Sequence, residues 1–256
     1  GIVGVGMVGS KIESLAKALG FKVLLNDPPR ARREGADKFC SLDYLLSNSD
    51  IITFHTPLIR QGEDATFHLM DESKLALLKK GAVVINSSRG EVCETRAMLK
   101  GLDNGQISRL VLDVWENEPN IDSKLHNKVW IGTPHIAGYS VDGKSNGSTM
   151  TIHAIAREFG LPLQDWQPTS LPVPDYPFIH LDNNSEPAYL TAAKAILRTY
   201  DILEDDKRLR EDPEDFEKQR GSYPVRREFH IWEITPSRAT RPETIEMLMA
   251  LGFRVK

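Results

Sequence analysis

Cysteine is scarce in this sequence. The 256 residues include only two, Cys40 and Cys93, which lie far apart and in no spacing typical of a metal site. A dense disulfide framework or a cysteine-based zinc site is therefore excluded as the basis of the fold. We expect two reduced thiols in a cytoplasmic protein.

Long apolar runs and a strong net charge are also missing. No apolar stretch approaches the roughly 20 residues of a membrane-spanning helix. The net charge is −4, so no global field attracts nucleic acid or an anionic membrane, and we expect neither as a partner. Hydrophobic residues make up 40% and charged residues 27% of the chain, which is ordinary for a globular protein of one large or two smaller domains.

The chain starts at Gly1 rather than at a methionine, and only a few apolar residues precede a glycine motif. A core strand usually has about five or six residues. We therefore expect further residues upstream in the natural protein.

Short apolar runs alternate with amphipathic segments through the first 160 residues. The runs are continuously apolar, which is typical of parallel strands covered on both faces. The repeated strand–helix order predicts an α/β fold of the Rossmann type, a doubly wound parallel sheet, over residues 1–160. The expected strands are residues 1–5, 21–25, 50–54, 82–86, 110–114 and 129–131, and the expected helices are residues 8–19, 42–47, 72–78 and 94–104.

A glycine motif joins the first expected strand to the first expected helix. Gly4 permits a tight turn, Gly6 lets the backbone approach a pyrophosphate, and Gly9 lets the helix pack closely on the strand. The helix N-terminus then offers free amides and a positive dipole to phosphate groups. The alternative is an ordinary glycine-rich turn.

An acidic residue ends the second expected strand. Asp27 follows Gly9 by 18 residues, close to the spacing of about 20 in dinucleotide-binding motifs. Its carboxylate would accept from the ribose hydroxyls and repel a 2′-phosphate, which favours NAD over NADP. Three nearby arginines weaken that preference, namely Arg30, Arg32 and Arg33.

Polar side chains follow three successive expected strands, where ligands bind in an open parallel sheet. Arg89 can bind a carboxylate with two hydrogen bonds and polarise a developing carbonyl. His135 can remove a hydroxyl proton, and Glu118 can orient its imidazole. Asp113 can hydrogen-bond a nicotinamide amide. The set fits oxidation of a 2-hydroxy acid by NAD, which needs no metal, although each residue alone could be an ordinary loop residue.

Residues 1 to about 160 resemble the D-isomer-specific 2-hydroxyacid dehydrogenases, and five segments carry the resemblance. They read GIVGVGMVG, HTPL, INSSRGEV, LDVWENEP and TPHIAGYS. The resemblance implies a substrate-binding subdomain ahead of the glycine motif. It also implies that Arg89, Glu118 and His135 are catalytic. The cofactor contacts that it implies are Met7, Val8, Asp27, Thr56, Ser87, Ser88, Arg89, Asp113 and Gly138.

Other segments resemble one branch of this family, which oxidises a phosphorylated 2-hydroxy acid in pyridoxal 5′-phosphate biosynthesis. They are NDPPRA, HIAGYSVDGKSNG and the long tail. This likeness implies that Tyr139 contacts the substrate, although Tyr139 could equally be a packing aromatic. Two other functions stay open: oxidation of 3-phosphoglycerate, and a corepressor-like protein that senses NAD(H) without catalysis.

The second half of the sequence predicts a smaller unit. Five prolines lie within residues 161–184, which predicts an extended connector between residues 1–160 and 185–256. We expect helices at residues 143–159, 187–203 and 242–251, and strands at 228–234 and 253–255. Residues 204–220 are dense in both charges and read as a solvated face or loop.

A unit of about 70 residues has a marginal core by itself. The resemblance implies that residues 185–256 form a C-terminal dimerisation domain, and hence a homodimer. A regulatory or merely stabilising appendage is the alternative.

Overall fold

The computed structural model describes residues 1–182 and 186–256. The chain forms two compact units, Gly1–His135 with Ile202–Ser222, and Ile136–Asp201 with Tyr223–Lys256. These units do not coincide with the ranges predicted from the sequence. The end of the predicted connector, Asn183 and Asn184, and the first residue of the predicted C-terminal domain, Ser185, lie outside the described residues.

The first unit contains a six-stranded parallel sheet in the order β2-β1-β3-β4-β5-β6. The strand order reverses between β1 and β3, so the carboxyl end of the sheet has its switch point there. This is the doubly wound architecture predicted from the sequence. The strands are β1 Ile2–Val3, β2 Leu25–Asn26, β3 Ile51–Phe54, β4 Ala82–Asn86, β5 Ile107–Leu112 and β6 Ile131–Gly132.

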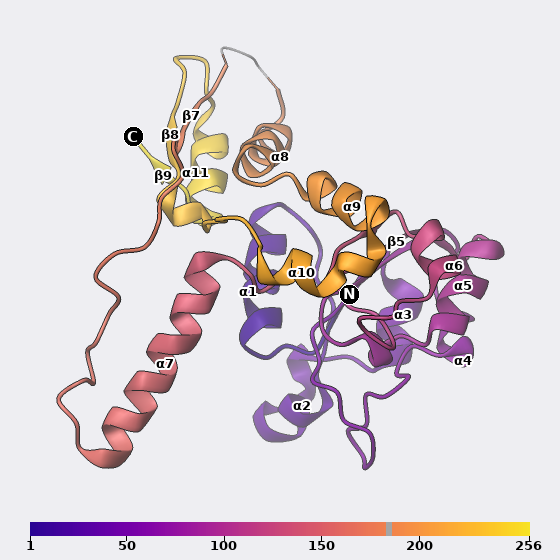
Figure 1. The fold of residues 1–256 in the computed structure, drawn as a ribbon. Helices are drawn as coiled ribbons and strands as arrows, with labels where there is room; N and C mark the ends of the chain where they lie inside the picture. Colours follow the sequence, from indigo (N-terminus) through magenta and orange to yellow (C-terminus); the bar gives the residue numbers. More distant parts are fainter. Residues whose placement is uncertain (183–185) are drawn as a thin grey trace. The chain divides into compact units, whose positions relative to one another are not determined.

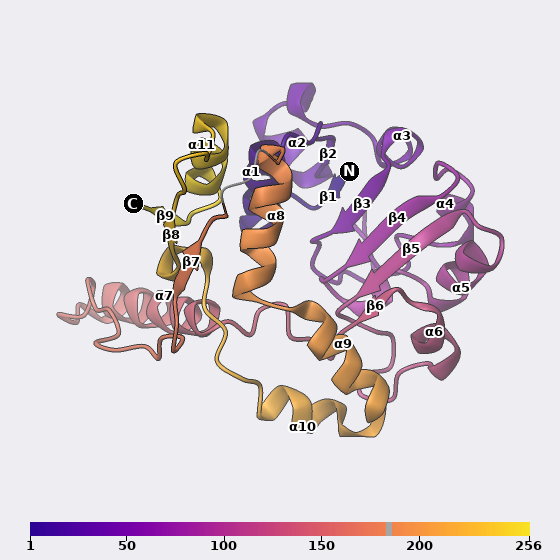
Figure 2. The same cartoon turned by 90° about the horizontal axis from the view of Figure 1, so that it is seen from above.

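Helices cover both faces of this sheet (Figure 2). The α-helices of the first unit are α1 Met7–Ala18, α2 Pro28–Glu34, α3 Leu42–Asn48, α4 Glu72–Leu75, α5 Thr95–Asp103, α6 Ser123–Lys128, α9 Ile202–Glu211 and α10 Phe216–Gly221. Three 3₁₀ helices join them: η1 Ala36–Lys38, η2 Gly90–Val92 and η3 Pro213–Asp215. The six predicted strands and four predicted helices are all present, with shifted bounds.

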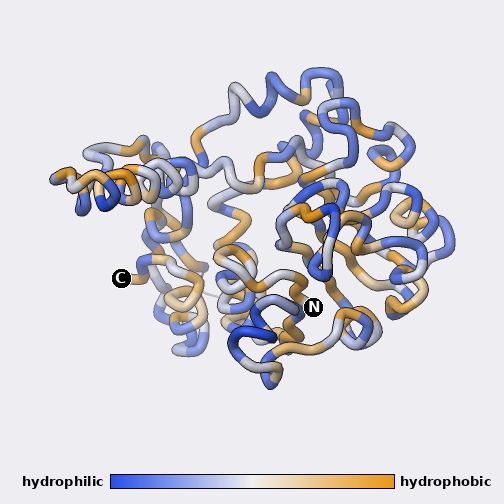
Figure 3. Tube along the Cα trace, turned by 90° about the horizontal axis from the view of Figure 1, so that it is seen from below, coloured by the Kyte–Doolittle hydropathy of each residue, from blue (hydrophilic) through white to orange (hydrophobic). Residues whose placement is uncertain are grey.

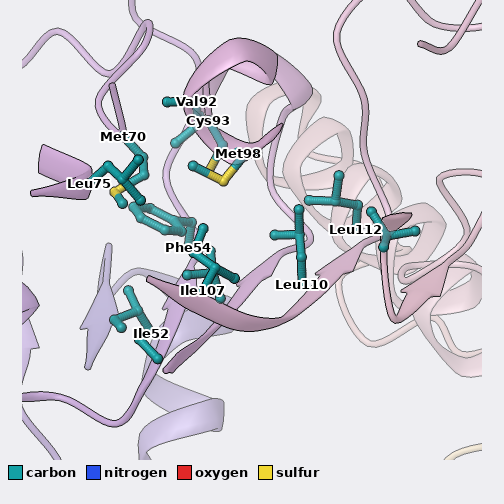
Figure 4. Close-up of a cluster of buried hydrophobic side chains, with 14 of the residues drawn as sticks. Ile52, Phe54, Met70, Leu75, Val92, Cys93, Met98, Ile107, Leu110 and Leu112 are labelled. Atoms are coloured by element: carbon teal, nitrogen blue, oxygen red, sulfur yellow. The ribbon is translucent and has the colours of Figure 1, made fainter. Parts of the chain in front are cut away.

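The core of the first unit lies between the central strands and α5. Figure 4 shows side chains of β3, β5 and α5 gathered in one cluster. Phe54, Met98 and Leu110 are completely buried there. Burying a side chain of this size contributes about 1.5–3 kcal/mol, so this cluster holds the strands whose ends carry the polar residues.

Helix α2 was not predicted, because Pro28 and Pro29 were interpreted only as the end of a strand. Proline is well tolerated in the first turn of a helix, where its missing N–H needs no partner. Asp27 caps the helix by accepting from the amide of Arg30 at 2.9 Å. Helix α6 was also missed; Asp122 caps it in the same way.

Residues 204–220 were predicted to form a solvated face or loop, and they form a solvated face, since the helices α9 and α10 occupy most of the segment. Their charges are mostly exposed, while Leu209 and Phe216 are completely buried. Asp206 accepts from the amide of Gly132 at 2.7 Å, and Arg210 donates to the carbonyl of Val129 at 3.0 Å. These contacts attach the segment to β6, which is why it belongs to the first unit.

The second unit contains the parallel sheet β7-β8-β9 with α8 and α11 beside it (Figure 1). Helix α7 contains both hydrophobic and hydrophilic residues (Figure 3). The elements are α7 Val141–Phe159, β7 Phe178–His180, α8 Ala188–Thr199, η4 Phe229–Ile231, β8 Glu233–Thr235, α11 Pro242–Ala250 and β9 Arg254–Val255.

Two predictions for this unit need correction. The expected strand at residues 228–234 is a 3₁₀ turn followed by β8, so the alternation of apolar residues there was not a strand signal throughout. The proline-rich connector contains β7, which pairs with β8, because its prolines precede the three residues that form the ladder. Among the described residues, no helix is long and apolar enough to cross a membrane.

Candidate active site

The glycine motif forms the turn between β1 and α1. Gly4 has a φ of +85°, and a Cβ there would lie 2.7 Å from the carbonyl oxygen of His55. A Cβ on Gly9 would lie 2.0 Å from the carbonyl oxygen of Gly4. By contrast, no atom lies within 4 Å of a Cβ built on Gly6. Gly4 and Gly9 are therefore required by the fold, whereas Gly6 leaves open space over the turn.

The open space lies at the N-terminus of α1, which has no side-chain cap. Met7 and Val8 are exposed in its first turn, at 74% and 58%. Thr56, at the end of β3, has a buried hydroxyl with no hydrogen-bond partner among the described residues. Free amides, exposed apolar side chains and an orphan hydroxyl around one glycine turn fit a dinucleotide such as NAD.

Asp27 lies at the end of β2 and binds this turn directly. Its Oδ2 accepts from the amide of Val5 at 2.8 Å, and its Oδ1 caps α2. The nearby arginines all have acidic partners. Arg30 and Arg33 pair with Glu34, and Arg32 pairs with Glu63 and Asp64. The hydrogen bond from Arg30 is the main cause that lowers the pKa of Glu34 to about 2.

The ends of β4, β5 and β6 are held side by side by backbone hydrogen bonds. The amide of Asp113 donates to the carbonyl of Asn86 at 3.0 Å, and the amide of His135 donates to the carbonyl of Asp113 at 2.7 Å. These bonds continue the parallel ladder one step beyond the strands. The segments that carry Arg89, Glu118 and His135 are therefore neighbours on one rim.

The loop with Arg89 is shaped by a buried asparagine. Asn86 Oδ1 accepts from the amide and the hydroxyl of Ser88, at 3.0 and 2.8 Å, and its Nδ2 donates to the carbonyl of Arg89 at 2.8 Å. A Cβ on Gly90 would lie 2.0 Å from the carbonyl of Trp115. The Arg89 loop thus abuts the loop after β5, and the Arg89 side chain is exposed at that junction. Ser87, also predicted as a cofactor contact, is half-buried in the same loop.

His135 and Glu118 form a hydrogen-bonded pair. His135 Nδ1 lies 2.7 Å from Glu118 Oε2, and Glu118 Oε1 accepts from the amide of Trp115 at 2.7 Å. A carboxylate only accepts hydrogen bonds, so Nδ1 carries the proton and Nε2 is left to exchange a proton with a substrate. The backbone of His135 has a positive φ of 54°, an uncommon conformation that aims the ring at Glu118.

Asp113 is buried beside this pair. Its Oδ1 accepts from the hydroxyl of Thr133 at 2.6 Å. The indole of Trp115 donates to the carbonyl of Thr133 at 3.0 Å. These bonds fix the start of the segment that leads to His135.

Sequence reasoning missed a second histidine–carboxylate pair on the same loops. His68 Nε2 lies 2.7 Å from Glu116 Oε1, and Glu116 Oε2 accepts from the amide of Thr95 at the start of α5. The amide of His68 also donates to the carbonyl of Glu91. Burial alone would raise the pKa of Glu116, but the hydrogen bonds from Thr95 and His68 outweigh it and lower that pKa. The pair joins the loops after β3, β4 and β5.

Two predicted contacts, Gly138 and Tyr139, lie in the second unit. A Cβ on Gly138 would meet no atom within 4 Å. The ring of Tyr139 packs edge-on against Tyr223, with ring centres 5.9 Å apart. The ammonium of Lys144 lies 4.0 Å from the Tyr139 ring centre.

Comparison with known proteins identifies the family of this chain. Residues 1–137 match the model of the D-isomer specific 2-hydroxyacid dehydrogenase, NAD binding domain. The chain belongs to this family. The resemblance of the sequence segments is thereby confirmed, and the first unit carries the family's NAD-binding domain.

Curated relatives match over nearly the whole chain. The erythronate-4-phosphate dehydrogenase of Bacteroides thetaiotaomicron is 46% identical over 234 residues, which are 91% of this chain and 64% of that protein. The enzyme of the same name from Proteus mirabilis is 43% identical over 256 residues, 99% of this chain and 67% of that protein. The chain therefore spans about two thirds of the length of these relatives.

A family member of known structure shares the fold. The D-lactate dehydrogenase of Aquifex aeolicus, solved with NAD and lactic acid, is 29% identical with a TM-score of 0.52, covering 64% of this chain and 54% of that one. Residues 170–252 match a separate domain of unknown function, DUF3410.

Proposed function

We propose that this protein is an NAD-dependent dehydrogenase that oxidises 4-phospho-D-erythronate to (R)-3-hydroxy-2-oxo-4-phosphooxybutanoate. The pair of His135 and Glu118, on the same rim as Arg89 and the glycine turn, is the observation that carries the proposal. The name shared by the curated relatives supports this substrate. The reaction belongs to pyridoxal 5′-phosphate biosynthesis, and we place it in the cytoplasm.

Three residues carry the chemistry of the oxidation. Arg89 binds the substrate carboxylate with two hydrogen bonds and stabilises the oxygen that becomes a carbonyl. His135 Nε2 takes the hydroxyl proton from C2. Glu118 holds the imidazole in the tautomer that leaves Nε2 free to act, and stabilises the ring once it is charged. NAD, when bound, supplies the acceptor for the hydride from C2.

The cofactor is held by residues around the glycine turn and the strand ends. The first turn of α1 with Met7 and Val8 binds the pyrophosphate, and Asp27 accepts from the adenosine ribose. Asp113 accepts from the nicotinamide amide. The remaining contacts come from Thr56, Ser87, Ser88, Arg89 and Gly138. Tyr139 contacts the substrate.

The protein acts as a homodimer joined through residues 185–256. A small unit gains stability by self-association, and the three-stranded sheet has a modest core. Sedimentation at several concentrations tests this assignment, which a monomer at all concentrations would contradict.

The deciding experiment follows NADH absorbance in the full-length protein with NAD and 4-phospho-D-erythronate, beside 3-phosphoglycerate. We expect a clear preference for the erythronate. His135→Ala should abolish turnover and leave NADH affinity near that of the wild type. A preference for 3-phosphoglycerate would keep the mechanism and change the substrate. Tight NADH binding with no turnover of either acid would favour the NAD(H)-sensing alternative.

A further inference from the structure

Arg226, a residue of the second unit, binds the backbone segment that follows His135. Arg226 Nη2 donates to two successive carbonyls, those of Ile136 at 2.8 Å and Ala137 at 2.9 Å. Its own carbonyl accepts from the amide of Val141 at 2.8 Å. One residue therefore contacts the segment on both sides of Gly138 and Tyr139.

The guanidinium of Arg226 is itself held by aromatic rings. It lies 4.6 Å from the ring centre of Tyr200 and 5.3 Å from that of Tyr223. Its Nη1 is 3.1 Å from the hydroxyl of Tyr223. Tyr223 also packs edge-on against Tyr139, so Arg226 and Tyr139 share a neighbour. The planar, stacked guanidinium is pre-organised for two carbonyls in a way that a lysine ammonium is not.

The next residue anchors the end of the segment. Arg227 forms two hydrogen bonds of 2.9 Å with the carboxylate of Asp142, and both side chains are buried. The amide of Glu228 donates to the same carboxylate. Burial would raise the pKa of Asp142, but these bonds and the charge of Arg227 outweigh it and lower that pKa. Asp142 is therefore a carboxylate at neutral pH, and the anchor is an ion pair.

We propose that Arg226 is a positioning residue that sets the backbone of residues 136–141, and through it Gly138 and Tyr139. Arg226 lies within the domain of unknown function. This domain would therefore shape the loop of residues 136–141, in addition to forming the proposed dimer interface. Its Nη1 and Nη2 groups face a tyrosine hydroxyl and two carbonyls, so we assign it a role through the loop rather than on the substrate. The expected kinetic effect rests on the function proposed above.

The experiment compares Arg226→Lys with Arg226→Gln in the full-length protein. Arg241→Lys is the matched control, because Arg241 also donates to a backbone carbonyl, that of Glu186, in the same unit. We expect the KM for 4-phospho-D-erythronate to rise about tenfold to a hundredfold in both Arg226 variants, since small displacements of a binding group cost this much. The kcat should change less, and NADH affinity and the Tm should stay near those of the wild type.

Hydrogen exchange of residues 136–141 supplies a readout that needs no turnover. We expect faster exchange in Arg226→Lys and no change in Arg241→Lys. Equal KM values and equal hydrogen-exchange rates in Arg226→Lys and Arg241→Lys would overturn the proposal. Weaker binding of inorganic phosphate to Arg226→Lys would also overturn it, because Arg226 would then contact the substrate. If the wild type fails to oxidise the erythronate but exchange still increases, the positioning role stands and the proposed substrate fails.

Discussion

His135 Nδ1 lies 2.7 Å from Glu118 Oε2, and the other oxygen of Glu118 accepts from the amide of Trp115. The carboxylate is thus fixed at one end by the backbone of its own loop and at the other by the imidazole. Such an arrangement restricts the ring to one orientation and one tautomer. It also places a negative charge where the ring becomes positive after taking a proton.

Glu118→Gln should therefore reduce catalysis far more than binding. Trp115 and His135 bind different oxygens of Glu118, so a glutamine in the same position would turn its NH₂ group toward one of these two donors. We expect kcat/KM to fall about a hundredfold or more, within the range of general-base contributions. The dissociation constant of NADH should stay near that of the wild type. Initial rates and fluorescence titration measure the two quantities.

Glu116→Gln is the matched control, since Glu116 pairs with His68 at the same distance, two residues earlier in the loop. We expect it to lower kcat/KM much less than Glu118→Gln does. An equal loss in the two variants would mean that Glu118 serves only to hold the loop.

Gly6 and Gly9 offer a test of where a dinucleotide approaches the turn. Gly6 has a φ of −74°, and a Cβ there would meet no atom within 4 Å. Gly6→Ala should keep the wild-type Tm and weaken NADH binding, because the methyl group would occupy the space of the pyrophosphate. Unchanged NADH affinity in this variant would place the pyrophosphate elsewhere.

Gly9→Ala is the opposite case, because its Cβ would lie 2.0 Å from the carbonyl oxygen of Gly4. We expect a lower Tm, since the backbone must shift to accept the methyl group. The pair of variants separates a loss of binding from a loss of fold.

The fold of the first unit and its rim were predictable because parallel strands leave local signals. Most strands are rich in apolar residues, and polar residues such as Asp113 and His135 follow within three residues of the strand ends. Residues 204–220 gave no such signal, because two buried side chains, Leu209 and Phe216, are hidden among many charges. The attachment of this segment to β6 depends on contacts between residues more than seventy positions apart.

The pair of His68 and Glu116 could not be predicted for a different reason. It depends on two backbone conformations, a φ of 51° at His68 and of 63° at Asn117. Asn117 lies between Glu116 and Glu118, which bind different histidines. Residues other than glycine adopt positive φ only where the surrounding structure imposes it, so the sequence alone carries no sign of it.

Asp27→Asn should relax the preference for NADH over NADPH. The carboxylate repels a 2′-phosphate, and Arg30, Arg32 and Arg33 already have acidic partners. We expect the dissociation constant of NADPH divided by that of NADH to fall about tenfold, which corresponds to about 1.4 kcal/mol. Asp37→Asn, on an exposed turn, is the control. An unchanged ratio in Asp27→Asn would place ribose selection elsewhere in the cofactor site.

The lowered pKa of His55 predicts how the free energy of unfolding depends on pH. Burial lowers the pKa of His55 from 6.5 to about 4, and its Nε2 lies 2.9 Å from the hydroxyl of Thr53. Above pH 6.5 the imidazole is neutral in both the folded and the unfolded chain, so it adds no pH dependence. As the pH falls below 6.5, only the unfolded chain takes up the proton, and the free energy of unfolding decreases until the pH reaches the folded pKa.

We therefore expect His55 to reduce the free energy of unfolding by about 2 kcal/mol between pH 7 and pH 5. Urea denaturation at the two pH values measures this change. His55→Gln cannot be protonated, so its stability should fall by about 2 kcal/mol less over the same interval. His153→Gln is the control, because it removes another half-buried histidine, whose ring lies 2.8 Å from the carbonyl oxygen of Trp166. If wild type and His55→Gln lose the same stability, the imidazole of His55 is not the source of the acid sensitivity.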